Sequence, residues 1–331
     1  MDNVDGKQAR RTGTSSPLGE LFDHGIDSLN CTLASLLETA AMGFGPSRTG
    51  AFTAMVPVLP MFFSTWETYH THTLYLGYFN GPTEGLIIAT SMMVVSGIYG
   101  PEIWKTPLLD VPYVRDVNVL SRVITHQTSI RDVWVPVILG TFFVAHLPFC
   151  ILNVWKARSA RNEPMLPTFL QWTPMLLFLT GLIGWLGSPY TTLLKSPQEH
   201  SLVLFCLTMS LVFGRMTTKI ILAHLTRQPF PYFTVMLVPL LAGAVLVNLP
   251  ALGLNPVFDY TIELWYLRNY FLFAAVVYGR WAVLVINSIC NYLGINCLSI
   301  PVKAREGRKI APGQLEVEKD VSNGATTKKA Q

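Results

Sequence analysis

Residues 18–44 read LGELFDHGIDSLNCTLASLLETAAMGF, a segment in which apolar residues outnumber polar ones although acidic residues stand near its start. A helix needs about 20 predominantly apolar residues to cross a bilayer, so this segment is long enough to span one. Further apolar segments follow it at 51–68, 84–100, 132–155, 167–188, 200–225, 230–252 and 263–292. The pattern predicts an all-α polytopic membrane protein with about eight transmembrane helices.

The composition agrees with a membrane protein. Hydrophobic residues make up 50% of the 331 positions and charged residues only 13%, whereas a soluble domain has about 25% charged residues. The formal net charge is +4, and the basic residues lie mostly in short connectors and the tail, which argues against a nucleic-acid-binding surface. The five cysteines show no metal-binding or redox spacing and are expected to be single buried thiols.

The chain divides into a membrane domain and a tail. We expect residues 1–292 to form the membrane domain. Residues 293–331 form the tail, which from residue 301 onward is polar, mixed in charge and without hydrophobic periodicity. Such a segment cannot bury enough apolar surface to offset the entropy of ordering it, so we expect a cytosolic, disordered tail.

Basic residues predict the orientation. With eight crossings, the basic clusters within 7–11, 156–161 and 303–309 fall on one side of the membrane, which the positive-inside rule makes cytosolic. The loop at 101–131 also carries basic residues, but acidic residues accompany them. The chain ends in TTKKAQ (326–331), which resembles the cytosol-facing dilysine retrieval signal of endoplasmic-reticulum membrane proteins. We therefore expect an endoplasmic-reticulum protein, with the Golgi as the alternative.

A cluster of acidic residues stands where the membrane part begins, and its members are Asp2, Asp5, Asp23 and Asp27. Gly19, Asp23 and Asp27 are each four residues apart and share one helix face. The intervening RRTGTSSP (10–17) is typical of a turn, which predicts two helices with facing carboxylates. Four bare carboxylates at the edge of hydrocarbon would repel one another, so cations are needed among them, and all-oxygen ligands suit hard divalent cations. The pattern predicts two metal ions that share a phosphorylated ligand.

Small and basic residues beside the aspartates fit a phosphate ligand. Gly6 and Ala9 leave space for its approach, and Arg10 supplies a planar cation that suits phosphate. The alternative is an ordinary juxtamembrane stretch with solvated charges. That alternative accounts for two aspartates near the interface, but not for Asp23 and Asp27 on one stripe with a glycine.

The same residues carry a family resemblance. They match the signature of CDP-alcohol phosphotransferases, D-x2-D-G-x2-A-R-x8-G-x3-D-x3-D, over residues 2–27, with Asp2, Asp5, Gly6, Ala9, Arg10, Gly19, Asp23 and Asp27 at its fixed positions. Three further stretches resemble the choline/ethanolamine phosphotransferase branch, namely PLGELFDHG (17–25), GPTEG (81–85) and TTKIILAHLT (217–226). TWETYHTHTLYLG (65–77) is similar to fungal members of that branch.

The resemblance implies a reaction and a ligand set. Two Mg2+ or Mn2+ ions would bind the four aspartates, and Gly6, Ala9, Arg10 and Gly19 would hold the CDP-alcohol. The hydroxyl of a diacylglycerol would attack the phosphorus that carries choline or ethanolamine, and CMP would leave. Phosphoryl transfer depends mainly on positioning and charge stabilisation, which agrees with a site made of aspartates and one arginine.

Three residues are candidates for the general base. Asp27 is the usual candidate in the family, and His24 lies between two predicted metal ligands. Glu84, at the start of the third segment, is expected on the same side of the membrane and could pair with His24. Ordinary roles for His24 and Glu84, as an interfacial histidine and as a helix-dipole partner, remain alternatives.

Other polar residues in the apolar segments allow two interpretations. Lys219, in the sixth segment, would approach the phosphates, extend to the interface or pair with a neighbouring helix. His70 and His72 are two residues apart and would not share a helix face, which favours an interfacial belt over a metal site.

Two other functions are alternatives to phosphotransfer. A cation-coupled transporter would bind its ions in broken helices near the midplane, whereas these aspartates lie at one membrane edge. The second alternative is a truncated, catalytically impaired family member, because Met1 directly precedes Asp2 and the helices that usually precede the signature would be missing. The choice between choline and ethanolamine and the oligomeric state stay open; membrane enzymes of this kind are often homodimers.

Overall fold

The computed structural model describes residues 2–13, 15–72, 82–110, 127–194 and 200–297, with the backbone alone for residues 2–5, 82–84 and 86. These residues belong to two compact units. The first comprises Met1–Gly19 and Ala282–Gln331, and the second comprises Glu20–Trp281.

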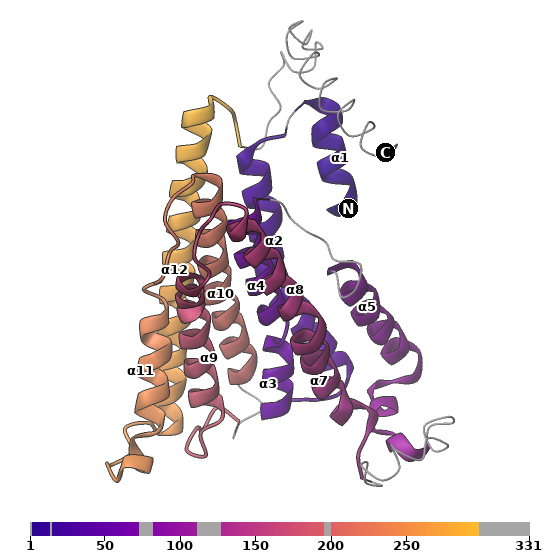
Figure 1. The fold of residues 1–331 in the computed structure, drawn as a ribbon. Helices are drawn as coiled ribbons and strands as arrows, with labels where there is room; N and C mark the ends of the chain where they lie inside the picture. Colours follow the sequence, from indigo (N-terminus) through magenta and orange to yellow (C-terminus); the bar gives the residue numbers. More distant parts are fainter. Residues whose placement is uncertain (1, 14, 73–81, 111–126, 195–199, 298–331) are drawn as a thin grey trace, which may run out of the picture. The chain divides into compact units, whose positions relative to one another are not determined.

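Helices make up the regular structure of the described residues (Figure 1). The α-helices are α1 (Asp2–Thr12), α2 (Pro17–Ala41), α3 (Arg48–Met55), α4 (Val58–Thr71), α5 (Pro82–Tyr99), α7 (Ile130–Thr141), α8 (Leu147–Ser159), α9 (Thr173–Leu186), α10 (Ser201–Leu225), α11 (Leu237–Val247) and α12 (Tyr260–Leu293). Short 3-10 helices lie at Pro101–Lys105, Leu108–Asp110, Leu166–Trp172 and Leu249–Leu252. Strands are absent from the described ranges, so the prediction of an all-α protein is confirmed.

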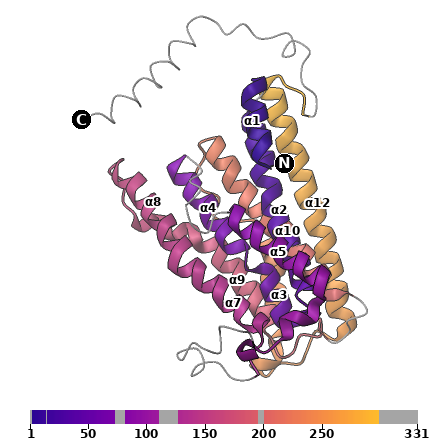
Figure 2. The same ribbon diagram turned by 90° about the vertical axis from the view of Figure 1, so that its right-hand side faces the viewer.

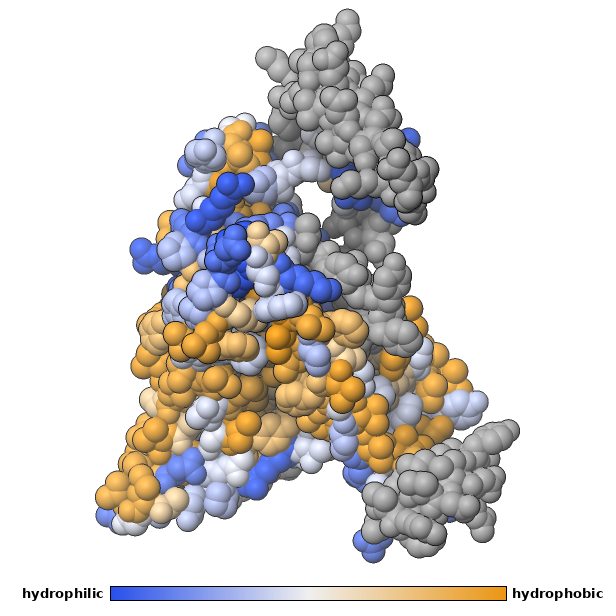
Figure 3. Space-filling model, in the orientation of Figure 1, coloured by the Kyte–Doolittle hydropathy of each residue, from blue (hydrophilic) through white to orange (hydrophobic). Residues whose placement is uncertain are grey.

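Membrane-spanning character is clearest in the longest helices. Within the described part of the chain, four helical stretches are long and apolar enough to cross a bilayer: Ile130–Ser159, Leu166–Leu186, Ser201–Leu225 and Tyr260–Leu293. On the face drawn in Figure 3, hydrophobic side chains form a band with hydrophilic ones at both of its ends. Large apolar side chains on the surface include Val144, which is 80% exposed. Exposed apolar surface on this scale is typical of a multi-pass membrane protein, while the number of eight crossings stays a prediction.

Prolines interrupt two of the predicted segments. The second, 51–68, consists of α3 and α4, which meet at Val56 and Pro57. The seventh, 230–252, is α-helical only from Leu237 to Val247. Pro229 and Pro231 precede that helix, and because proline lacks the N–H that a helix requires, a regular helix does not begin until beyond them.

A turn of π-helix joins α7 to α8. It covers Phe142–His146, and the N–H of Leu147 donates to the carbonyl of Phe142, five residues back. Pro148 follows directly, and its missing N–H leaves the carbonyl four residues before it without an ordinary helical donor. The wider turn keeps the helix continuous across the proline, and Figure 2 shows α7 and α8 as one rod.

The core of the second unit lies between α4, α8, α9, α10 and α11. Helix α4 packs against α8 and α10, and α9 packs against α11. Trp66, Trp185, Phe205 and Phe213 are fully buried there. This packing fixes α10, which in turn supports the helix that carries two of the predicted metal ligands.

Candidate active site

Helix α2 begins with a side-chain cap. The N–H of Gly19 donates to the hydroxyl of Ser16 at 3.2 Å, and Pro17 occupies the first helical position, where its missing N–H costs nothing. A methyl group at Gly19 would meet only that Ser16 oxygen, at 3.7 Å. Local packing therefore does not require glycine at position 19. The missing side chain leaves room for a ligand beside this turn of α2.

Asp23 and Asp27 lie one turn apart on α2 and are both half-buried. Their four-residue spacing in a regular helix puts the two carboxylates on one face. His24 is next to them, with Nε2 3.8 Å from Oδ2 of Asp23. The three side chains form the part of the predicted site that belongs to the second unit.

Close packing against α10 holds α2 in place. A methyl group at Gly25 would lie 3.0 Å from Cγ2 of Thr218, and Leu29 fills the space over Gly214, 2.5 Å from where a methyl group would be. One turn further along, the hydroxyls of Thr32 and Ser210 lie 2.5 Å apart. Contacts that run forward on α2 and backward on α10 describe two antiparallel helices, so α10 positions the face of α2 that carries the aspartates.

Three further side chains gather at the first turn of α2. His224, at the end of α10, has Nε2 3.8 Å from Oε1 of Glu20. Nδ1 of His224 lies 3.2 Å from Nδ1 of His72, and the two rings stack with centroids 5.1 Å apart. Glu20 lies four residues before His24, on the same side of the helix, and this spacing is the one sign of the group in the sequence. The partner histidines could not be assigned because they are 152 residues apart in the chain.

Helix α1 carries the rest of the signature. Asp2, Asp5, Gly6, Ala9 and Arg10 all lie on this one helix. A methyl group at Gly6 would meet the guanidinium of Arg10 at 3.7 Å, so glycine leaves the space beside that cation open. The helix belongs to the first unit, and the side chains of the two aspartates are outside the described residues. The predicted meeting of the four aspartates therefore stays a prediction.

Cation ligands are incomplete within the described side chains. No group of three or more histidine, cysteine or acidic side chains that could hold a metal ion occurs among them. Asp23 and Asp27 supply two carboxylates, so a metal site there needs oxygen atoms from elsewhere. The third candidate base, Glu84, lies in the first turn of α5, and its side chain is outside the described part.

Lys219 extends to the backbone of the segment that follows α10. Its Nζ donates to the carbonyl of Phe233 at 2.8 Å. One turn earlier, Arg215 donates to the hydroxyl of Thr234 and lies over the ring of Trp281, 5.8 Å from its centroid. These contacts join α10 to neighbouring segments. They agree with a role for Lys219 in helix pairing.

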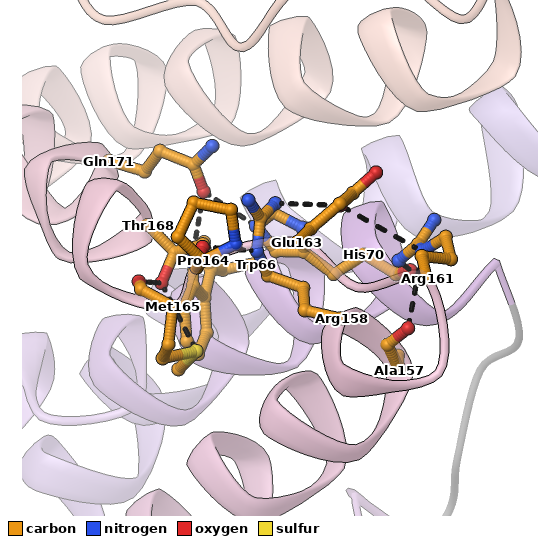
Figure 4. Close-up of polar contacts among 10 residues, drawn as sticks. All are labelled: Trp66, His70, Ala157, Arg158, Arg161, Glu163, Pro164, Met165, Thr168 and Gln171. Atoms are coloured by element: carbon orange, nitrogen blue, oxygen red, sulfur yellow. Dashed lines mark hydrogen bonds and ion pairs between the residues drawn. The ribbon is translucent and has the colours of Figure 1, made fainter.

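The polar residues at the end of α4 contact the connector after α8 (Figure 4). Oε1 of Gln171 lies 2.8 Å from Nε1 of Trp66, which donates to it, and 2.6 Å from Nε2 of His70. Arg161 donates to the carbonyl of His70, and Glu163 lies between Arg158 and Arg161 (Figure 4). His70 and His72 thus have different partners, and this cluster fixes the end of α4 beside the site.

Comparisons with known proteins agree with the signature. No family model matches the chain. A choline/ethanolaminephosphotransferase 1 of Arabidopsis thaliana is 34% identical over 316 residues, which cover 92% of this chain and 76% of that protein. The cholinephosphotransferase 1 of Saccharomyces cerevisiae is 33% identical over 238 residues, 70% of this chain and 57% of that protein.

A third relative supplies the family's name. An uncharacterized CDP-alcohol phosphatidyltransferase class-I family protein of Dictyostelium discoideum is 30% identical over 323 residues, which cover 92% of this chain and 76% of that protein. Identity at this level along nearly the whole chain confirms the predicted resemblance. The chain belongs to the CDP-alcohol phosphatidyltransferase class-I family.

Proposed function

We propose that the protein transfers phosphocholine or phosphoethanolamine from a CDP-alcohol to 1,2-diacylglycerol, which yields phosphatidylcholine or phosphatidylethanolamine and CMP. The observation that carries this proposal is the placement of Asp23, His24 and Asp27 on one end of α2, half-buried and supported along the helix by α10. Relatives named for choline, for ethanolamine and for both support either headgroup.

The donor set fits divalent metal ions. Two half-buried carboxylates one turn apart offer hard oxygen atoms on one helix face, as Mg2+ and Mn2+ prefer. Asp2 and Asp5 would complete the ligands for two ions together with Asp23 and Asp27. When bound, the ions would supply positive charge for the oxygens around the reacting phosphorus.

The other residues of the signature would bind the CDP-alcohol. Arg10 would contact the phosphates, and Gly6 keeps the space beside its guanidinium open. Ala9 and Gly19 would allow the nucleotide to approach α1 and the first turn of α2. The two glycines have no side chain, and that of Ala9 is a single methyl group, so none of these positions blocks the nucleotide.

The hydroxyl of diacylglycerol must lose its proton as it attacks the phosphorus. His24 is a candidate base because its imidazole nitrogen can accept a proton, and its Nε2 lies 3.8 Å from Oδ2 of Asp23 at the proposed site. Asp27, one turn further into the membrane helix, is the second candidate, and Glu84 is the third. We place the enzyme in the endoplasmic-reticulum membrane with this end of α2 facing the cytosol, and we propose a homodimer as its assembly.

Labelled substrates test the proposed reaction. Microsomes from a host without endogenous activity would receive this chain, labelled CDP-choline or CDP-ethanolamine, diacylglycerol and Mg2+. We expect labelled phospholipid and CMP, both lost when the metal is chelated with EDTA and restored by added Mg2+ or Mn2+. Asp23→Asn and Asp27→Asn should each lower kcat at least about a hundredfold, because a charged oxygen is lost where charge stabilisation matters most.

A matched substitution controls for the loss of a carboxylate. Glu102 is exposed and pairs only with Lys105 at 2.8 Å on the described surface, so Glu102→Gln should leave turnover unchanged. Activity that survives both aspartate substitutions would overturn the metal assignment. Uptake of a solute into proteoliposomes without release of CMP would instead favour the transporter.

A further inference from the structure

His72 has a left-handed backbone, as His200 has at the start of α10. It ends α4 in the left-handed conformation, with φ 55° and ψ 18°. This conformation is costly for residues other than glycine, and a structure retains it where surrounding contacts hold it in place. The contact that His72 gains is the one with His224, whose ring stacks on it.

The hydrogen bond between the two rings requires one Nδ1 to carry a proton and the other to be bare. Nδ1 of His72 and Nδ1 of His224 are 3.2 Å apart, so one nitrogen must donate and the other accept. The opposite nitrogen of His224, Nε2, lies 3.8 Å from a carboxylate oxygen of Glu20. A neutral His224 that accepts at Nδ1 carries its proton on Nε2, where it faces the negative charge of Glu20. The reverse arrangement would turn a bare nitrogen toward that carboxylate.

The carboxylate therefore selects one direction. His72 donates to His224, and His224 presents its N–H to Glu20, so that each group orients the next. The groups that face His224 are Glu20 and His24 from α2 and His72 from α4. Glu20 is three residues before Asp23 and four before His24, in the turn that leads into the proposed site.

We propose that His72 and His224 are positioning residues for the phosphotransfer reaction: they hold Glu20 and, through it, set the first turn of α2 that presents Asp23 and His24. The pair acts through Glu20 and touches no reacting atom. The proposal rests on the proposed function.

Substitutions that keep or remove single nitrogen atoms test the pair. Asparagine tolerates the left-handed backbone and places an amide N–H near the position of Nδ1, so His72→Asn should keep most of kcat. His72→Gly relieves the backbone but removes the ring, and it should lower kcat about tenfold to a hundredfold without lowering the unfolding temperature. His224→Phe keeps a ring but no nitrogen and should lose at least as much. His224→Gln places an amide N–H near the position of Nε2 and should therefore keep a higher kcat than His224→Phe.

A double-mutant cycle separates positioning from a general structural role. If the histidines act through Glu20, His72→Gly should cost little more in a Glu20→Gln background than Glu20→Gln costs alone. The loss should appear in kcat, with KM for the CDP-alcohol within about threefold of the original value. His200 is exposed at the other end of α10, so His200→Gln is the control and should leave turnover unchanged.

Each outcome has a distinct meaning. Full activity of His72→Gly and His224→Phe in microsomes where the unaltered chain is active would overturn the positioning role and leave the proposed reaction standing. Additive losses in the double-mutant cycle would show that the histidines do not act through Glu20. No turnover by the unaltered chain would overturn the proposed function, and the positioning role with it.

Discussion

At the scale of single residues, Glu263 shows how a carboxylate is accommodated inside the apolar core. It is fully buried in the first turn of α12. Oε1 accepts hydrogen bonds from Trp185 and Thr191, each at 2.7 Å, and Oε2 accepts from the backbone and the hydroxyl of Thr192 at 2.7 and 2.5 Å. The helix N-terminus adds favourable partial charge. These donors replace the water that burial removes.

Replacing Glu263 with glutamine should therefore destabilise the protein. An amide oxygen can satisfy one pair of donors, but the amide NH2 would then face other donors, and the backbone N–H of Thr192 cannot turn away. A buried donor without an acceptor costs about 1–3 kcal/mol, so the unfolding temperature in detergent should fall for Glu263→Gln. The exposed Glu102→Gln is the matched control. Equal stability of the two variants would contradict this role of the carboxylate.

The residues of the site differ in how far the sequence predicts them. Asp23 and Asp27 were found because their four-residue spacing survives in any regular helix. Glu20 was overlooked because its partners, His72 and His224, come from the ends of two distant helices. Local spacing predicts which side chains share a face, but the antiparallel packing of α2 on α10 decides which distant ones meet there.

At the scale of helices, glycines let α9 and α11 pack closely. A methyl group at Gly243 would lie 2.2 Å from Cζ3 of Trp185, and one at Gly181 would lie 2.5 Å from Cγ of Leu240. Small residues allow membrane helices to approach each other, because lipid provides no hydrophobic force between them. Trp185 cannot swing aside freely, since its indole N–H is bonded to Glu263.

Gly243→Ala should thus be costly. We expect a loss of about 1–3 kcal/mol of stability, because the added methyl group must displace a ring that is bonded on its other side. At Gly279 on α12, an added methyl group would meet no atom of the described residues within 4 Å. Gly279→Ala should be neutral or stabilise by up to about 1 kcal/mol, as alanine favours the helix. Thermal unfolding in the same detergent compares the two, and equal effects would contradict the packing argument.

Hydropathy predicted the location of the helical segments better than their continuity. It responds to the average apolar character of a stretch, so 51–68 was predicted as one span although Pro57 divides it into α3 and α4. Conversely, Pro148 does not divide α7 from α8, because a turn of π-helix accommodates it. Whether a proline breaks a helix depends on the packing around it, which composition does not contain.

At the scale of the molecule, contacts within the second unit sort its helix ends into two sets. Glu20, His72 and His224 meet at one end. At another place Arg131 donates to the carbonyl of Gly43, and elsewhere Arg48 donates to that of Ser188. Each pairing joins helix ends that an alternating path through the membrane would put on the same side. The side that faces the cytosol stays a prediction from the basic residues.

A native cysteine can test that topology. Cys297 is exposed just beyond the end of α12, whereas Cys150 and Cys206 are buried in the core. If this end of α12 is cytosolic, a membrane-impermeant maleimide should label the chain in intact microsomes, and Cys297→Ser should lose most of the label. Cys290 and Cys31, which are both half-buried, are the remaining candidates for label.

The opposite side of the membrane provides the control. Glu102 is exposed in the short helix after α5, within the loop that the positive-inside rule leaves ambiguous. In a chain that carries Cys290→Ser and Cys297→Ser, Glu102→Cys should react only after the microsomes are permeabilised. Labelling of Glu102→Cys in intact microsomes would show that this loop faces the cytosol, contrary to the prediction. If Cys297 is labelled in intact microsomes as well, an even number of crossings separates the two positions instead of the predicted five, and the eight-span topology would be wrong. The basic residues of that loop would then indicate its side correctly, although more basic residues lie in the other connectors and the tail.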